Sequence, residues 1–162
     1  MPKIFNAAEI ADLGIEKEKK RRDFYALVAS SFKDSEMKKL FSRLRDWEEE
    51  HIKKFTQIRN EIRETEPVES YPGELATYMQ SLVDDLLYNK VSAQAFSKNV
   101  TSSLVAIDFA IGFEKDAILF FLEMLSYMNS SQKEIVQTLI NEEKQHVVYL
   151  SQLRKDINNR KK

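Results

Sequence analysis

Glu48-Glu49-Glu50-His51 and Glu143-Lys144-Gln145-His146 are the two stretches that decide the fold, and they contain the only two histidines of the 162-residue chain. In each stretch a Glu precedes the His by three residues, which places both side chains on neighbouring points of one helical face. A carboxylate oxygen and an imidazole nitrogen at this spacing can hold one metal ion between them. The sequence therefore predicts that both stretches are helical and carry metal ligands.

The residues around each motif follow the three-and-four spacing of an amphipathic helix. The expected core-facing positions are Phe41, Leu44, Glu48, His51, Phe55, Ile58 and Ile62; Leu104, Ile107, Ile111, Glu114, Ile118, Phe121 and Leu125; and Val136, Leu139, Glu143, His146, Leu150, Leu153 and Ile157. Each stripe is apolar except at its middle. A fourth stripe, from Ala11 through Ile15, Glu18 and Tyr25 to Phe32, is less regular because Arg22 falls on it.

Capping residues and helix breakers predict the boundaries of these helices. Helices are expected over residues 6–30, 34–64, 102–127 and 131–158, with capping boxes at Asn6 with Glu9 and at Ser131 with Glu134. The long connection over residues 65–101 carries a short amphipathic helix, residues 74–88. Because the other loops are short, we expect a single all-α domain, 1–162, built as a four-helix bundle of two helical hairpins.

The chain also contains an internal repeat, in which polar core residues recur 95 or 96 positions apart. The matching pairs are Glu18 and Glu114, Glu48 and Glu143, His51 and His146, and Tyr25 and Phe121. The two hairpins thus look like copies of one unit that meet at a polar centre.

Composition excludes several classes of function. The net charge is −1, so no overall field favours nucleic acid, and we expect the basic run over residues 17–22 to be a solvated helix face. Cysteine is absent, which excludes disulfides, thiolate catalysis and iron–sulfur ligation. No apolar run reaches the length of a membrane span and no signal peptide is recognisable, so the expected location is the cytoplasm.

Two facing half-sites would bring together four carboxylates and two imidazoles. The predicted ligands are Glu18, Glu48, His51, Glu114, Glu143 and His146. Four negative charges balance two divalent cations, and mixed oxygen and nitrogen ligation suits iron or manganese better than zinc or copper(I). Without metal, we expect mutual repulsion and burial to raise the pKa of all four glutamates.

Several neighbours of these ligands have alternative interpretations. Glu142 is either a surface residue or a carboxylate that orients the opposite imidazole. Tyr25 is either a core tyrosine or a hydrogen-bond donor at the site. The expected packing residues are Phe55, Ile118, Phe121 and Leu122.

On these residues the sequence resembles the ferritin-like superfamily, and most closely the rubrerythrins. The resemblance covers nearly the whole chain and rests on Glu18 with Tyr25, Glu48-Glu49-Glu50-His51, Phe113-Glu114-Lys115-Asp116 with Phe120-Phe121, and Glu143-Lys144-Gln145-His146. It implies that the six predicted ligands bind two iron ions, that the protein reduces peroxide or reacts with dioxygen, and that Tyr25 takes part in catalysis.

Two departures from rubrerythrins leave alternatives open. No cysteine-ligated rubredoxin domain is present, so the resemblance implies a separate electron-donor protein. The additional Glu that rubrerythrins often carry one turn after Glu114 is replaced by Ala117, which makes the ligand set more like that of bacterioferritin. Iron storage and a metal-free interaction module remain alternatives, with storage ranked lower because ferritin cages use a further short C-terminal helix. We expect a homodimer, in which the helix over residues 74–88 covers the bundle or the dimer interface.

Overall fold

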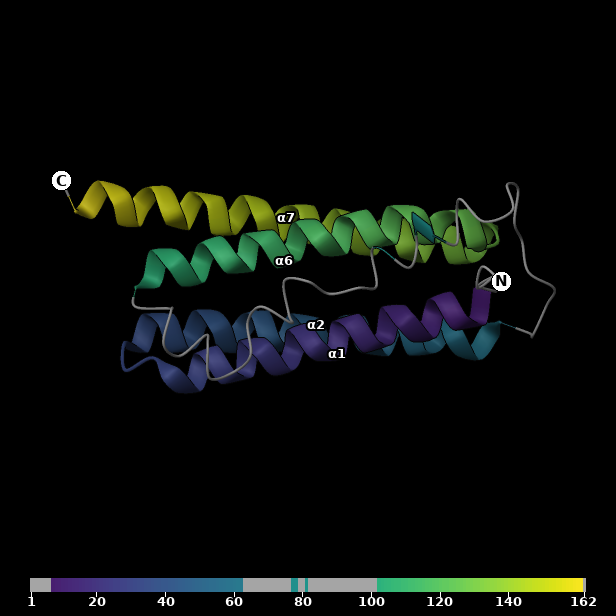
Figure 1. The fold of residues 1–162 in the computed structure, drawn as a ribbon, viewed down its shortest axis with the longest axis horizontal. Helices are drawn as coiled ribbons and strands as arrows, with labels where there is room; N and C mark the ends of the chain where they lie inside the picture. Colours follow the sequence, from purple (N-terminus) through teal and green to yellow (C-terminus); the bar gives the residue numbers. More distant parts are fainter. Residues whose placement is uncertain (1–6, 63–76, 79–80, 82–101, 162) are drawn as a thin grey trace.

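The computed structural model describes residues 7–62, 77, 78, 81 and 102–161. Its long helices are α1 (Ala7–Ser31), α2 (Ser35–Glu61), α6 (Ser103–Met124) and α7 (Ser130–Arg160), and a short 3₁₀ helix, η1 (Leu125–Tyr127), follows α6. These elements form a four-helix bundle (Figure 1), so the predicted all-α fold is confirmed. None of the described helices has both the length and the apolar composition needed to cross a membrane.

The helix termini follow capping chemistry, with one correction to the sequence-based boundaries. The Asp34 side chain accepts a hydrogen bond from the Glu36 amide at 2.8 Å and begins α2 as predicted. The capping box of α7 is Asn129 with Gln132, so the predicted box at Ser131 was wrong. Both stretches match the same pattern, but the helix begins two residues earlier, where the Asn129 side chain already satisfies the amide of Gln132. Asn6 lies outside the described residues.

Each pair of consecutive helices forms an antiparallel hairpin, α1 with α2 and α6 with α7 (Figure 1). The two hairpins lie side by side, and α6 begins at the same end of the bundle as α2. The end of α2 and the start of α6 therefore lie at opposite ends of the bundle. The short helix predicted over residues 74–88 lies outside the described residues except at positions 77, 78 and 81.

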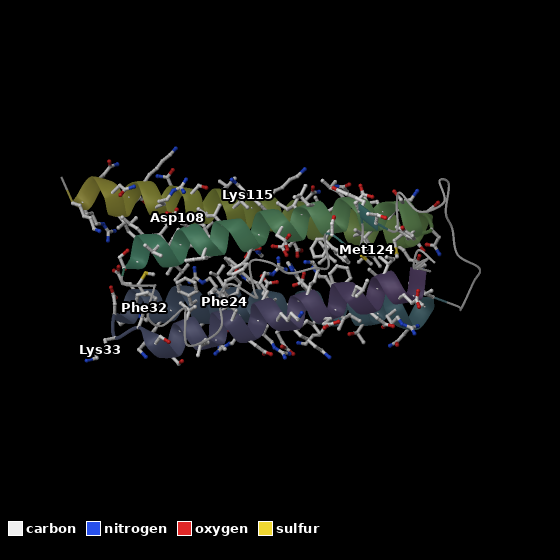
Figure 2. All side chains as sticks on the ribbon, in the orientation of Figure 1. Phe24, Phe32, Lys33, Asp108, Lys115 and Met124 are labelled. Carbon is white, nitrogen blue, oxygen red and sulfur yellow. The ribbon has the colours of Figure 1, made fainter. Side chains whose placement is uncertain are left out.

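Two apolar clusters fill the bundle, one on each side of a polar layer. Phe55, Phe121 and Ile140 belong to one cluster, and Phe41 and Ile107 belong to the other. Figure 2 shows Met124 within the first cluster and Phe24 within the second, between the hairpins. Every predicted ligand falls between these clusters along its own helix.

Most of the predicted core positions lie in or against the two apolar clusters, although Leu104 is half-buried and belongs to neither. Leu122 is 45% exposed and lies outside the core, because α6 is apolar on more of its circumference than the bundle can bury. Arg22 lies at the edge of the α1 stripe, where its side chain is 28% exposed and bonds Glu49 at 2.9 Å.

Candidate metal centre

The structure brings all six predicted ligands together in the polar layer. Glu18 comes from α1, Glu48 and His51 from α2, Glu114 from α6, and Glu143 and His146 from α7. Their potential ligand atoms form two groups, each within 4.8 Å. The first half-site is Glu18, Glu48, His51 and Glu143, and the second half-site is Glu48, Glu114, Glu143 and His146. Glu48 and Glu143 belong to both and could bridge two ions.

Unpartnered ligand atoms test whether this cluster fits metal. All four carboxyl groups are fully buried. Three of their oxygens have no hydrogen-bond partner, namely Glu18 Oε2, Glu48 Oε1 and Glu114 Oε2. His51 Nδ1 also forms no hydrogen bond, although it lies 2.9 Å from Glu143 Oε1. Leaving such atoms unsatisfied costs several kcal/mol, of order 1–3 for each neutral group and more for charged ones. Divalent cations would satisfy them, so the donor set fits two hard or borderline metal ions.

His51 is oriented by a carboxylate outside the cluster. Its Nε2 contacts Glu142 Oε2 at 2.9 Å, while its Nδ1 faces Glu143 Oε1 at 2.9 Å. Lys54 in turn donates to the other oxygen of Glu142 at 2.8 Å. When Nε2–H donates to Glu142, the lone pair of Nδ1 points toward the four glutamates. Glu142 therefore contacts the opposite imidazole, as the interpretation of Glu142 as an orienting carboxylate requires.

His146 is oriented differently, by an aromatic ring. Trp47 occupies the position equivalent to Glu142 in the repeat and stacks on the His146 imidazole, with ring centroids 4.3 Å apart and planes 8° apart. His146 Nδ1 lies 3.0 Å from Glu143 Oε2. Both imidazoles also line a groove of about 580 Å³ between α2 and α7, together with Trp47 and Glu142. This groove reaches the two imidazoles from the surface, and none of the four buried glutamates lines it.

Tyr25 is a hydrogen-bond donor at the centre and not only a packing residue. Its hydroxyl donates to Glu114 Oε1 at 2.6 Å, which links α1 to α6. The side chain is fully buried, and burial together with the Glu114 charge raises the pKa of Tyr25 well above its usual value. Tyr25 therefore holds its proton against the carboxylate.

Arg21 also lies in the cluster, and the sequence-based reasoning missed it. The side chain is 2% exposed, and its Nη2 donates to Glu48 Oε2 at 2.8 Å, to Glu143 Oε1 at 3.0 Å and to Glu18 Oε1. Its Nη1 donates to the Phe113 carbonyl at 3.4 Å. One guanidinium thus binds three of the four carboxylates.

Comparison with solved structures identifies the architecture. A crystal structure from Thermotoga maritima at 2.30 Å resolution superimposes with a TM-score of 0.71 and 21% sequence identity, over 94% of this chain and 96% of that chain. The fold is ferritin-like. That protein is provisionally described as a ferritin-like diiron-carboxylate protein. No protein-family model matches the sequence, and no curated protein matches it.

Within this ferritin-like bundle, the basic run over residues 17–22 is a solvated face only at Lys19 and Lys20, which are exposed as predicted. Lys17 is 7% exposed and bonds Asp116 on α6 at 3.0 Å, and Arg21 lies one turn further along α1. The available signal was the spacing, because Arg21 follows Glu18 by three residues, as each His follows its Glu. The sequence pattern predicted Arg22 on the core-facing stripe of α1, because positions three and four residues after Glu18 both lie near the same helical face.

Arg21 also changes the charge state of the cluster, so the expectation that all four glutamates have raised pKa values was wrong. Burial alone would raise the pKa of Glu18 and Glu143, but the Arg21 charge together with hydrogen bonds from neighbouring side chains outweighs burial and lowers the pKa of both. Burial keeps the pKa of Glu48 well above its usual value and raises that of Glu114 to about 7. Burial opposes charging of His146, yet its carboxylate neighbours raise the pKa to about 9.

Proposed function

We propose that this protein is a two-metal carboxylate oxidoreductase. The observation that carries the proposal is the pair of ligand groups that share Glu48 and Glu143, in a ferritin-like bundle. Glu18, Glu48, His51, Glu114, Glu143 and His146 would bind two iron ions, and manganese also suits the donor set. The substrate would be peroxide or dioxygen, and a separate protein would supply electrons. We place the protein in the cytoplasm as a homodimer.

Two iron ions would supply open coordination positions and the two electrons needed to reduce a small oxidant. The chain's own residues prepare the site for this chemistry. Glu142 sets the tautomer of His51, and Trp47 restricts the ring orientation of His146. Tyr25 keeps a proton 2.6 Å from Glu114 Oε1 and is the candidate catalytic residue, because an O–O bond that is cleaved needs protons.

Access to the cluster favours a small substrate. The four carboxyl groups are fully buried, and the imidazoles are 2% and 7% exposed. The groove between α2 and α7 reaches the imidazoles but not the four buried glutamates of the cluster. Apolar clusters close the site on both sides. Peroxide and dioxygen are small enough for such a site, whereas larger organic substrates are not.

A second candidate is ferroxidase chemistry in iron handling. It is favoured by Ala117, which lies in the apolar cluster one turn after Glu114 and provides no further carboxylate. Particle mass in solution separates the two candidates, since storage requires a multi-subunit shell and the oxidoreductase proposal expects a dimer.

The test is anaerobic loading with ferrous iron, followed by stopped-flow absorbance on mixing with peroxide and, separately, with dioxygen. We expect two irons per chain and faster oxidation by the physiological oxidant. Glu48→Gln should abolish two-iron loading, because Glu48 belongs to both half-sites. Glu50→Gln is the matched control, since Glu50 lies on the same helix, is exposed and bonds only Lys53 among the described residues. Equal loading of the two variants would refute the proposal.

A further inference from the structure

We propose that Arg21 is an internal cation that occupies the first half-site, so that metal binds the second half-site first and enters the first only when the guanidinium leaves. This inference rests on the proposed two-metal function and concerns the order and relative affinity of binding. It assigns to Arg21 a role that no ligand motif includes.

The guanidinium uses the oxygens that the first half-site needs. His51 Nδ1 lies 2.9 Å from Glu143 Oε1 and 3.5 Å from Glu48 Oε2. These same two oxygens accept hydrogen bonds from Arg21 Nη2 at 3.0 and 2.8 Å. A divalent ion bound between them and His51 would lie about 2.1 Å from each oxygen. Two cations cannot share these oxygens at such distances in a dry site without strong repulsion.

The second half-site is left open by the same arrangement. Arg21 Nη2 bonds Glu18 Oε1, Glu48 Oε2 and Glu143 Oε1, so its three acceptors all belong to the first half-site. Glu18 Oε2 is unpartnered there, whereas Glu48 Oε1 and Glu114 Oε2 are unpartnered in the second half-site. Arg21 Nη1 is 3.6 Å from Glu114 Oε2, too far for a hydrogen bond. His146 Nδ1 faces this half-site and lies 3.0 Å from Glu143 Oε2. The second half-site thus offers Glu48 Oε1, Glu114 Oε2 and Glu143 Oε2, none of which accepts a hydrogen bond from the guanidinium.

The internal repeat shows that Arg21 is the residue that makes the two half-sites differ. Each of the six ligands has a counterpart of the same type in the other hairpin, but the counterpart of Arg21, 96 residues later, is Ala117. Ala117 is 6% exposed and belongs to an apolar cluster, so nothing equivalent blocks the second half-site. Arg21→Ala would make the two half-sites alike at this position.

Charge balance explains how such a cation fits the metal-free protein. The guanidinium offsets part of the negative charge that the buried carboxylates carry, and one divalent ion in the second half-site would reduce the remainder. Full occupancy by two divalent ions balances four carboxylates without it. The ion that enters the first half-site must therefore replace the three hydrogen bonds of Arg21 Nη2. Hydrogen bonds between charged groups are among the strongest in proteins.

The experiment is a titration of the metal-free protein with Mn²⁺, followed by calorimetry and by the electron paramagnetic resonance signal of free Mn²⁺, with no oxidant present. We expect two binding steps whose dissociation constants differ on the order of 100-fold. His146→Ala should remove the tight step and His51→Ala the weak one. In Arg21→Ala the ratio of the two constants should fall at least about tenfold. Repulsion between two bound ions would also separate the two binding steps. If repulsion were the only cause, the ratio of the two constants would be the same in Arg21→Ala as in the wild type.

Arg22→Ala is the matched control, because Arg22 is the next residue on α1 and bonds Asp23 and Glu49 away from the cluster. Its isotherm should match that of the wild type. An unchanged ratio in Arg21→Ala, a single step in the wild type, or loss of the tight step in His51→Ala would overturn the inference and leave the two-metal proposal standing. The histidine variants decide the assignment even where Arg21→Ala does not fold. Absence of Mn²⁺ binding in all variants would overturn the inference and the proposed function together.

Discussion

Glu114→Gln should change how the stability of the metal-free protein depends on pH. The Glu114 carboxyl is fully buried on α6, and burial followed by the charge of Glu143 raises its pKa from 4.5 to about 7. Folding therefore opposes its ionisation. In the wild type, this group lowers the free energy of unfolding as pH rises from about 4.5 to 7, and the full loss persists above 7.

The size of the effect follows from the pKa difference. One pKa unit corresponds to about 1.4 kcal/mol, so a shift from 4.5 to about 7 costs the wild type about 3 kcal/mol above pH 7. Glutamine keeps the shape, does not ionise, and retains a carbonyl oxygen that can accept the Tyr25 hydroxyl. At pH 8 the metal-free variant should be more stable relative to the wild type than at pH 5, by about 2.5 kcal/mol, because part of the loss has already occurred at pH 5.

The assay is urea unfolding followed by circular dichroism at several pH values from 5 to 8, with chelator present. Glu123→Gln, on the same helix but outside the centre, should show the pH dependence of the wild type. Parallel stability curves for Glu114→Gln and the wild type would refute the argument, because Glu114 would then not titrate as a buried group. With metal present the order should reverse, since Glu114→Gln removes one ligand and weakens the stabilisation that binding provides.

Three further predictions concern single contacts. Glu142→Gln should weaken metal binding at the His51 half-site about 10- to 100-fold in an Mn²⁺ titration, because an amide no longer fixes the imidazole tautomer. Equal affinities of the variant and the wild type for Mn²⁺ would leave the 2.9 Å contact without a function. Tyr25→Phe should lower the stability of the metal-free protein by about 1–3 kcal/mol in urea unfolding, because its carboxylate partner loses a buried donor. Asn129→Ala should cost about 1 kcal/mol through the lost cap of α7, whereas Ser131→Ala should be close to neutral, and the reverse order would restore the capping box that was first predicted.

The sequence by itself determined the helical architecture and the six Glu and His residues that meet in the polar layer. Periodicity of 3.6 residues is a local property, so stripes such as Phe41 to Ile62 could be read without knowing the partner helix. A Glu three residues before each His is likewise local. Because buried carboxylates require partners, a polar residue in the middle of every stripe indicated that the stripes meet in one layer.

Only the tertiary structure decided what else enters that layer. Positions 21 and 22 both lie near the inner face of α1, and the choice between them depends on the rotation of the helix against its neighbours. Packing turned Arg21 inward, where three carboxylates from α1, α2 and α7 converge on it, and left Arg22 at the edge. Trp47 over His146 is a second example, because a stacked pair from two hairpins has no signature within either helix. Helix periodicity constrains the rotation of a helix about its own axis only to within part of a turn. The charge of the candidate metal centre depends on which single side chain of α1 points into it.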